Sequence, residues 1–239
     1  MAVSINTVYQ RVLAMANKEQ RGYITPQEFN LLANQAQLEI FEQYFYDLSQ
    51  FSRRPGVSLE YSDPIEIIEE KIAEFEKDHI DVTAVSGAVA TLPSDVHKLG
   101  TVFYNNGTNS IIVENVSRKE VETMVQTALY APSSARPVYA RLEDNKIQLY
   151  PSSSSPAYST SNINCHYIAK PATVSWGYNV VLQKAVYNAS STTDFELHAS
   201  EETTLVNKIL LLAGIVIEKP TISGLAGTMV NEEKQQEKA

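Results

Sequence analysis

The chain contains four histidines and one cysteine, the residue types that most often hold metal ions or act as nucleophiles. The stretch Asp78-His79-Ile80-Asp81 could form half of a metal site, because carboxylates stand on both sides of an imidazole. It lacks the paired histidine or cysteine spacing that marks a metal-binding motif. The other histidines, His97, His166 and His198, stand in unrelated contexts. Structural or solvent-exposed roles are therefore favoured for all four.

Cys165 and His166 are adjacent in a segment with the alternation of a β-strand. Neighbouring side chains of a strand point to opposite faces, which disfavours a nucleophile–base pair between the two. A buried thiol is the favoured interpretation. The sequence also has no glycine-rich phosphate loop, nucleophile elbow or HExxH motif. It therefore predicts no catalytic, cofactor-binding or metal site, and a protein that is not an enzyme.

The charge of the chain is acidic, with a formal net charge of −9 from 28 acidic and 19 basic residues. Binding along a phosphate backbone requires clustered lysine and arginine, so specific nucleic-acid binding is not expected. The acidic residues Glu66, Glu69, Glu70 and Glu74 recur on the outer side of a predicted helix that begins at Asp63-Pro64. They form either an ordinary solvated face or a wall that repels DNA in a channel.

Helical patterns lie at both ends of the chain. The strongest runs from Thr25 to about Gln50 and opens with a capping box and a proline in its first turn. Its apolar surface is wider than one stripe, because aromatic residues extend it: Phe41, Phe45 and Tyr46. Either this helix is sandwiched between two neighbours of one core, or one of its faces is buried by another subunit.

Short strands and turns fill the middle of the chain. Asn105-Asn106-Gly107-Thr108 is typical of a hairpin turn, because Asn-Gly supplies positive φ angles. A second hairpin is predicted around Glu143-Asp144-Asn145, and residues 163–169 should form a strand. Ser117 opens another capping box before a short helix, and the closing helix should start at Ser200.

Neither helical end has enough apolar surface for a core of its own, so the two ends are expected to pack together. The predicted fold class is α+β: a helical bundle of the N-terminal helices and the C-terminal helix, with an inserted antiparallel β domain. The predicted domains are residues 1–77 with 199–220 for the bundle, 78–198 for the insert, and 221–239 for an extended tail.

The tail, residues 221–239, starts apolar and ends in a run of charged and polar residues. It is either a frayed terminus or a segment that orders on a partner surface. In the second case the anchors are Leu225, Met229 and Val230. No apolar run reaches the roughly 18 residues that would span a membrane, and the first residues do not resemble a signal peptide. We expect a protein made and folded in a cytoplasm, with no membrane partner.

Four blocks of sequence, in this order, resemble the head-to-tail adaptor or neck ring proteins of short-tailed DNA phages, most of all a ring protein of crAss-like phages. The blocks are Asn6–Gln10 with Ala16–Asn30, Leu92–Val96 leading into Val102–Tyr104, Arg136–Tyr139 with Asn145–Pro151 and His166–Pro171, and Asp194–His198 with Ser200–Glu202. Each block is of modest specificity, and their succession along nearly the whole chain carries the likeness.

The resemblance implies a structural virion protein of the neck, beneath the portal vertex. Such adaptors assemble as a ring, here expected to be a dodecamer, that docks on the portal protein and extends the DNA ejection channel. They offer a platform for further neck or tail proteins and let double-stranded DNA pass without specific binding. Their C-terminal segment often grips the portal, a role that the resemblance carries onto residues 221–239.

Two other functions remain open from the residues alone. The β-rich middle, with its serine-rich loop around Tyr158, could belong to a tail- or fibre-associated module that binds a carbohydrate or receptor. A cell-wall hydrolase using Asp and Glu residues is the third alternative. Attachment at the distal tail would favour the module, and lysis of cell-wall material by the purified protein would favour the hydrolase.

Overall fold

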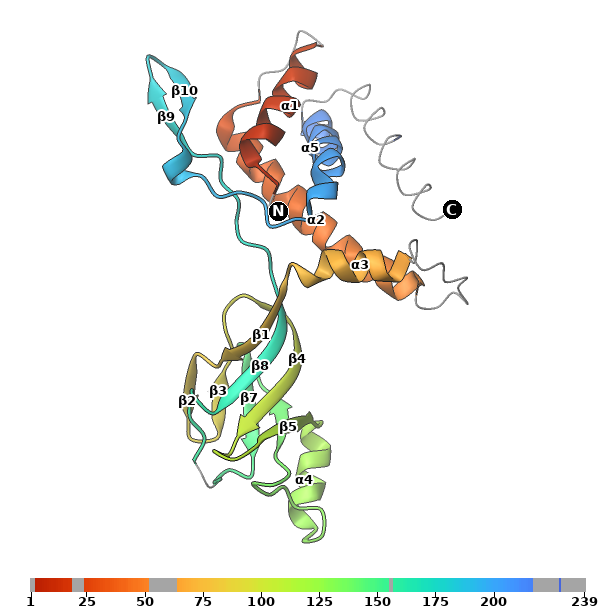
Figure 1. The fold of residues 1–239 in the computed structure, drawn as a ribbon, viewed down its shortest axis with the longest axis vertical. Helices are drawn as coiled ribbons and strands as arrows, with labels where there is room; N and C mark the ends of the chain where they lie inside the picture. The colour runs from red at the N-terminus through yellow and green to blue at the C-terminus, as the bar shows by residue number, and fades with distance from the viewer. Residues whose placement is uncertain (1–2, 19–23, 52–63, 155–156, 217–227, 229–239) are drawn as a thin grey trace. The chain divides into compact units, whose positions relative to one another are not determined.

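The computed structural model describes residues 3–18, 24–51, 64–154, 157–216 and 228. The chain divides into two compact units, residues 1–74 with 171–239 and residues 75–170 (Figure 1). Among the described residues, the first unit holds four α-helices and a two-stranded sheet, and the second holds an eight-stranded sheet and one α-helix. The predicted domain limits, 1–77 with 199–220, 78–198 and 221–239, stay a prediction.

The helices of the first unit come from both ends of the chain. They are α1 (Ile5–Lys18), α2 (Pro26–Phe51), α3 (Pro64–Ala73) and α5 (Glu202–Val216). The longest, α2, contacts both α3 and α5, and α1 contacts α5. Their buried side chains include Val8, Val12, Phe29, Phe41, Leu205 and Ile209. Burying each is worth about 1.5–3 kcal/mol, so packing, more than helix propensity, stabilises these helices.

Two helices begin at the capping boxes that the sequence predicts. Ahead of α2, the backbone N–H and the hydroxyl of Thr25 donate to Glu28 at 2.9 and 2.8 Å, and the Glu28 N–H donates back at 3.3 Å. The backbone hydrogen bond from Thr25, and then that from its hydroxyl, hold the pKa of Glu28 below its ordinary value. Ser117 and Glu120 form the same box ahead of α4 (Arg118–Gln126). Both predicted caps are confirmed.

An extended segment, residues 171–176, lies antiparallel along α2 and is held by side-chain amides of the helix. The Gln37 amide donates to the Ala172 carbonyl at 2.8 Å. Asn34 accepts from the Val174 N–H and donates to the Val174 carbonyl, both at 2.9 Å. Asn30 accepts from the Trp176 N–H at 2.8 Å and donates to the Trp176 carbonyl at 3.4 Å.

This amide ladder follows from two periodicities. Residues 30, 34 and 37 lie on one face of a helix, and every second residue of an extended chain points the same way. Two residues of extended chain advance about 6.6 Å, close to the roughly 6 Å between helix positions four apart. The ladder satisfies backbone groups that would otherwise be buried without partners, beside the buried side chain of Val174.

The second unit is an eight-stranded sheet with the order β1-β8-β4-β5-β6-β7-β3-β2. Its strands are β1 (Glu76–Asp81), β2 (Ala84–Ser86), β3 (Val89–Thr91), β4 (Val96–Asn105), β5 (Ser110–Asn115), β6 (Val138–Arg141), β7 (Lys146–Tyr150) and β8 (Ile163–Ala169). β1 and β2 are the two edge strands, yet only Val82 and Thr83 separate them in the chain. Three residue steps span at most about 11 Å, so the sheet must curl until its edges approach each other.

The inside of the curled sheet is a dry core of large side chains. It contains Val102, Tyr104, Ile147, Leu149, Ile163 and Cys165, all without solvent exposure. The sequence-predicted hairpin turns join strands that line this core, β4 to β5 around Gly107 and β6 to β7 around Asp144 and Asn145. All three turn residues have positive φ, as the Asn-Gly and Asp-Asn pairs predict. These turn predictions are confirmed.

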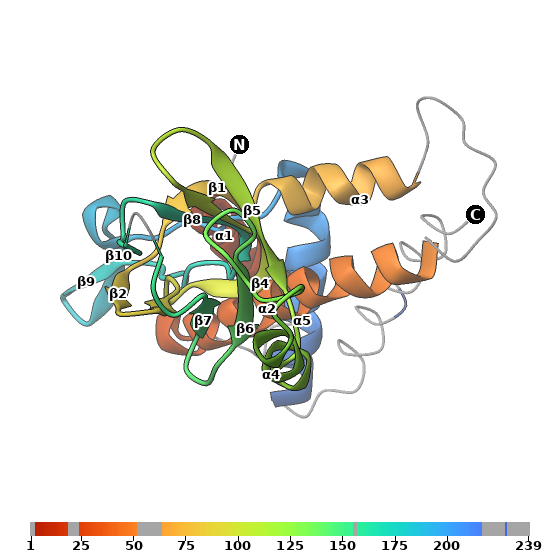
Figure 2. The same cartoon turned by 90° about the horizontal axis from the view of Figure 1, so that it is seen from below.

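One strand pair of this sheet is parallel. β5 and β6 run in the same direction, so the chain must cross over between them, and α4 lies in that connection. The helix packs on β6 over a small apolar cluster of Val116, Val121, Val138 and Ala140 (Figure 2).

The predicted fold class, a helical bundle with an inserted antiparallel β domain, is wrong. The chain is an α+β fold whose largest element, within the described residues, is one curled sheet of eight strands, accompanied by five α-helices. The sheet is mixed, because the β5–β6 pair is parallel. Long amphipathic helices give the strongest periodic signal in the sequence, whereas short strands that pair over large sequence distances give a weak one. The prediction therefore gave the helices too much weight.

Candidate interaction surfaces

The acidic residues singled out in the sequence lie on the outer side of α3 or just after it. Glu66, Glu69 and Glu70 are exposed on the helix, and Glu74 is exposed after its last turn. On the opposite side, Ile68 and Ile72 are buried, where α3 contacts α2. Closely spaced carboxylates on a solvated face repel polyanions without binding them. That this face lines a DNA channel stays a prediction.

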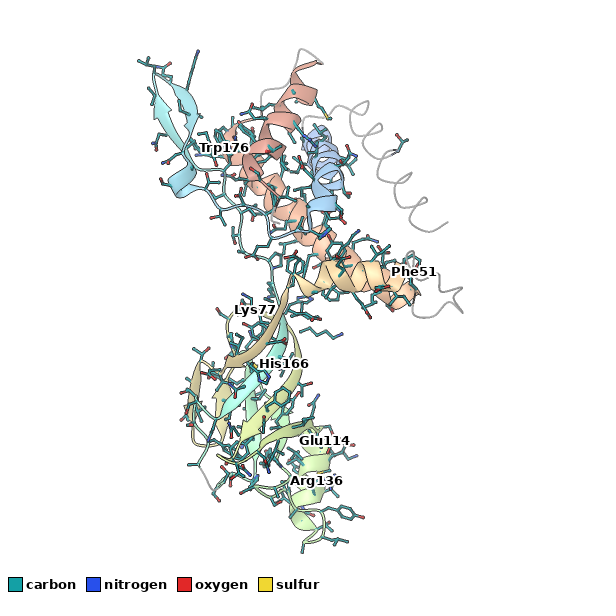
Figure 3. The ribbon with its side chains drawn as sticks, in the orientation of Figure 1. Phe51, Lys77, Glu114, Arg136, His166 and Trp176 are labelled. Carbon is teal, nitrogen blue, oxygen red and sulfur yellow. The ribbon has the colours of Figure 1, made fainter. Side chains whose placement is uncertain are left out.

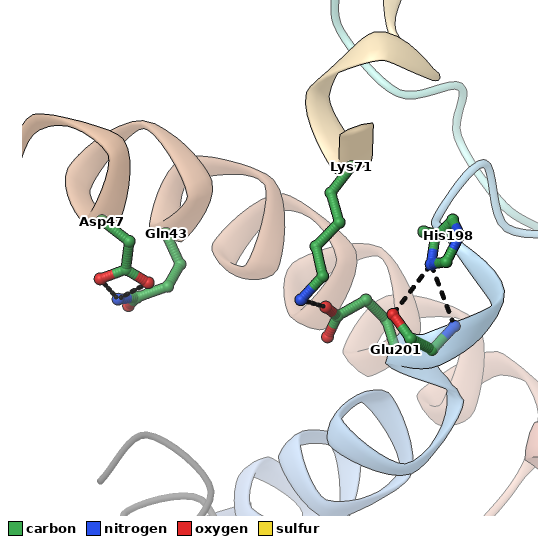
Figure 4. A network of polar contacts seen from close by, with 6 residues as sticks. Gln43, Asp47, Lys71, His198 and Glu201 are labelled. Atoms are coloured by element: carbon green, nitrogen blue, oxygen red, sulfur yellow. Dashed lines mark hydrogen bonds and ion pairs between the residues drawn. The ribbon is translucent and has the colours of Figure 1, made fainter. Parts of the chain in front are cut away.

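A buried ion pair joins α3 to the turn that precedes α5. The Lys71 ammonium lies 2.7 Å from Glu201 Oε1, and the two side chains are 13% and 7% exposed (Figure 4). The ammonium also lies 5.8 Å from the centre of the Tyr44 ring on α2. Glu201 belongs to the short 3₁₀ turn Ala199–Glu201, in which the Ser200 N–H donates to His198 Nδ1 at 3.3 Å. The pair fixes three elements to one another and has no feature of a reactive centre.

The first unit also carries a β-hairpin, β9 (Tyr178–Val181) with β10 (Lys184–Tyr187), which we call the arm. Its base is Trp176, which is buried and contacts the Tyr9 ring of α1 at 4.4 Å (Figure 3). The Trp176 indole N–H donates to Asn6 Oδ1 at 3.1 Å. On its other side the indole stacks with Tyr178 and contacts Tyr187, both at 5.8 Å between ring centres.

The residues that follow the second strand of the arm are packed as closely as those at its base. A Cβ built on Gly177 would lie 2.6 Å from the carbonyl carbon of Ser191, so only glycine fits there. The Asn188 N–H donates to the Gly177 carbonyl at 2.9 Å, and Ser175 and Thr193 exchange two backbone hydrogen bonds. The arm is thus tied at both of its ends to the extended segment that α2 holds.

The far half of the arm is apolar and exposed. Val180, Val181 and Val186 are at least half exposed, and Leu182 at the turn is 92% exposed. The sequence predicts one or two strands between Trp176 and Phe195 and indicates no role for them. The signal is the valine and tyrosine content of 178–181 and 184–187, residue types that are enriched in strands.

The second unit has an exposed apolar region of its own, at the end of α4. Val125, Leu129 and Tyr130 are exposed there, Leu129 at 84%. Tyr130 also lines a surface hollow of about 500 Å³ together with Met124 and Thr127. The hollow has no charged side chain except Lys119 and Glu120 at its rim, and Glu120 is already engaged by Ser117.

The structure brings two of the four histidines together. The rings of His79 and His166 meet edge to face at 4.6 Å, and both contact Phe103. His166 Nδ1 lies 3.4 Å from Asp78 Oδ1. Over the described residues, no group of three His, Cys, Asp or Glu side chains could hold a metal ion. Neither His97 nor His198 lies in this cluster.

Cys165 lies inside the curled sheet, and its thiol donates to the Ile80 carbonyl at 3.5 Å. Burial, followed by the nearby charges of Asp95 and Asp81, raises its pKa to about 11. A raised thiol pKa keeps the group protonated, so the reactive thiolate is scarce at neutral pH.

We expect Cys165 to resist alkylation in the native protein. At pH 8 a thiol of pKa about 8.5 is roughly one quarter thiolate, so unfolding should raise the rate of maleimide labelling at least about 100-fold. The measurement is mass spectrometry of labelled protein with and without 8 M urea, repeated between pH 7 and 10. Rapid labelling of folded protein at pH 8 would mean that the thiol is neither buried nor shifted.

The predicted anchors of the tail, Leu225, Met229 and Val230, lie outside the described residues. No described helix is long and apolar enough to cross a membrane. Comparison with protein-family models finds no family that matches the chain, and comparison with curated proteins finds no match either.

Proposed function

We propose that this protein is a structural virion protein, a head-to-tail adaptor of the neck of a short-tailed DNA phage. In this proposal it assembles as a ring, expected to be dodecameric, docks on the portal protein beneath the portal vertex, and extends the DNA channel. It then offers a platform to the neck or tail proteins that follow. The proposal rests on the resemblance described above together with one structural observation.

That observation is the arm. Its base is rigidly packed against α1 and the segment held by α2, while its apolar far half is exposed. Exposed valines and a leucine on a firmly held projection are unfavourable in water and are typical of surfaces that another protein covers. Association with another protein explains why these apolar side chains are exposed. The described histidines and Cys165 do not suggest a catalytic function as an alternative.

The acidic face of α3 fits the same proposal. If twelve copies formed a ring, their net charge of −9 each would sum to roughly one hundred negative charges. Carboxylates such as Glu66, Glu69, Glu70 and Glu74 on the inner wall would keep DNA from adhering during ejection. The role would be electrostatic and would need no specific contact with a base or phosphate.

The direct test is electron microscopy of the purified protein mixed with the portal protein of the same virus. We expect rings capping one end of the portal, with the rotational symmetry of the adaptor ring visible in class averages. A tail-fibre module would leave the portal uncapped. Particles that stay monomeric at tens of micromolar, with unaltered portal, would contradict the proposed function.

A further inference from the structure

The two faces of the arm differ: one carries the tyrosines that contact Trp176, and the other carries Asn179, Val181, Lys184 and Val186. Cross-strand pairing places Tyr178 opposite Tyr187 and Val180 opposite Ala185, so these four side chains share one face. This face continues outward from the buried Trp176, through the two tyrosines, to Val180 and the turn. We call it the apolar arm face. Its inner half is covered by Trp176, and its outer half is exposed.

The turn of the arm departs from the usual chemistry of hairpin turns. Leu182 and Gln183 both have positive φ, 48° and 62°, in a two-residue turn that strongly favours asparagine and glycine. A leucine there has an unfavourable backbone and an exposed apolar side chain at once. Departures of this kind from local preferences cluster at functional sites.

A second uncovered stripe runs along α2 in the same unit. The exposed residues Leu31, Gln35, Leu38, Glu42 and Tyr46 recur at steps of three and four, so they lie on one side of the helix. We call them the α2 outer stripe. Leu31 is 74% exposed and lies about 10 Å from Leu38 along the axis. The two strands at the tip of a hairpin are about 4.8 Å apart, so one tip can contact both leucines.

We propose that the apolar arm face and the arm tip of one copy dock on the α2 outer stripe of a second copy. Charge complementarity at the arm tip favours this partner: Lys184, which directly follows the turn, is the charged residue of the arm strands, and Glu42 is the charged residue of the stripe.

The contact is head to tail, because the two surfaces are different parts of one unit. A copy whose arm is docked still offers its own stripe, and the next copy can dock in turn. Repetition of such a contact closes into a ring or continues as a filament. Only the closure of the contacts into a ring rests on the proposed function. The pairing of the arm with the α2 outer stripe is inferred from the two surfaces themselves.

The test uses disulfide formation between copies. Because Cys165 is the single native cysteine and is buried, cysteines introduced at exposed positions react alone. Leu182→Cys and Leu38→Cys are made separately and together. Mixing the two single variants under mild oxidation should give a disulfide-linked pair, identified by peptide mass spectrometry, at least about ten times more abundant than with a control partner. The double variant should give a ladder of linked copies.

The control partner is Leu129→Cys, which is more exposed than Leu38, 84% against 46%, and lies just after α4 in the second unit. Equal yields with Leu38→Cys and Leu129→Cys would overturn the proposal. A charge exchange adds a second readout: Lys184→Glu should lower the yield about two- to five-fold, and Glu42→Lys in the partner should restore it. Loss of yield without recovery in the exchanged pair would also overturn the assigned partner.

The arm contact and the proposed function can fail separately. If wild-type rings cap the portal but residues 182 and 38 do not link within them, the arm contact is wrong and the adaptor function stands. If the ladder forms but no ring ever caps the portal, the contact stands and the adaptor function is wrong. A membrane surface is the alternative partner of the arm. If wild-type protein sediments with anionic phospholipid vesicles and Leu182→Asp protein does not, the arm binds a membrane surface and the proposed contact with a second copy is overturned.

Discussion

Replacing Lys71 by methionine is expected to destabilise the first unit by about 3–5 kcal/mol. The substitution keeps most of the length of the side chain and removes its charge, so Glu201 is left as a buried, uncompensated carboxylate at 7% exposure. Losing one partner of a buried pair costs more than the pair contributes, because the remaining charge cannot regain its hydration. The measurement is urea unfolding followed by the fluorescence of Trp176, the only tryptophan of the chain, which lies in the same unit.

Two further variants separate this cause from a simple loss of packing. Glu201→Leu should cost less than Lys71→Met, since the flexible lysine stem can carry its ammonium toward water. The double variant Lys71→Met, Glu201→Leu should recover most of the lost stability, because no charge is then buried. If the double variant is as unstable as the sum of the two single variants, the pair is not coupled and the explanation is wrong.

An exposed ion pair of the same unit supplies the control. The Arg11 guanidinium lies 3.0 Å from Glu202 Oε1 without hydrogen-bond alignment, and its side chain is 51% exposed. Such pairs contribute about 0–1 kcal/mol. Arg11→Met should therefore change the midpoint of unfolding little, although it removes the same type of charge from a neighbouring helix.

Local features of the fold could be predicted from the sequence, because each depends on a few adjacent residues. The capping boxes at Thr25 and Ser117 and the turns at Gly107 and Asp144 are encoded within four residues each. The extent of α2 could be predicted as well, since its apolar residues keep a helical period over seven turns.

The pairing of strands could not be predicted, because it depends on residues far apart in the chain. β8 lies between β1 and β4, and β6 pairs in parallel with β5 only because α4 carries the chain across. No local pattern in residues 110–115 or 138–141 distinguishes a parallel from an antiparallel neighbour. The predicted antiparallel insert failed at this pair for that reason.

Strands could be predicted in the region of the arm, whereas its turn and its anchor could not. Hairpin turns are recognised by glycine and asparagine, whereas this turn is Leu182-Gln183. Its anchor is equally hidden, since Trp176 contacts residues of α1 that precede it by about 170 positions. By contrast, the exposure of the acidic residues on α3 follows directly from their spacing against Ile68 and Ile72. Sequence patterns thus show which face of an element is buried more readily than which distant element covers it.

Replacing Trp176 by alanine is expected to have the second large effect, about 3–5 kcal/mol of lost stability in the first unit. The indole is 3% exposed and fills the space between Tyr9 on one side and the two arm tyrosines on the other. Its removal leaves a cavity and leaves Asn6 Oδ1 without the indole donor. Because the variant has no tryptophan, unfolding is followed by far-ultraviolet circular dichroism in urea.

Two further variants distinguish the contribution of the arm to stability from its contribution to association: Trp176→Phe and Val180→Asp. The phenylalanine retains most of the apolar contact and loses the indole hydrogen bond, so it should cost about 1–2 kcal/mol and keep the arm in place. Val180→Asp changes an exposed residue, so it should leave stability within about 0.5 kcal/mol while abolishing assembly. If Trp176→Ala protein still assembles as well as wild type at a temperature where it is folded, the arm need not be anchored to act. If Val180→Asp protein assembles normally, the exposed apolar residues of the arm are not the surface that another copy covers.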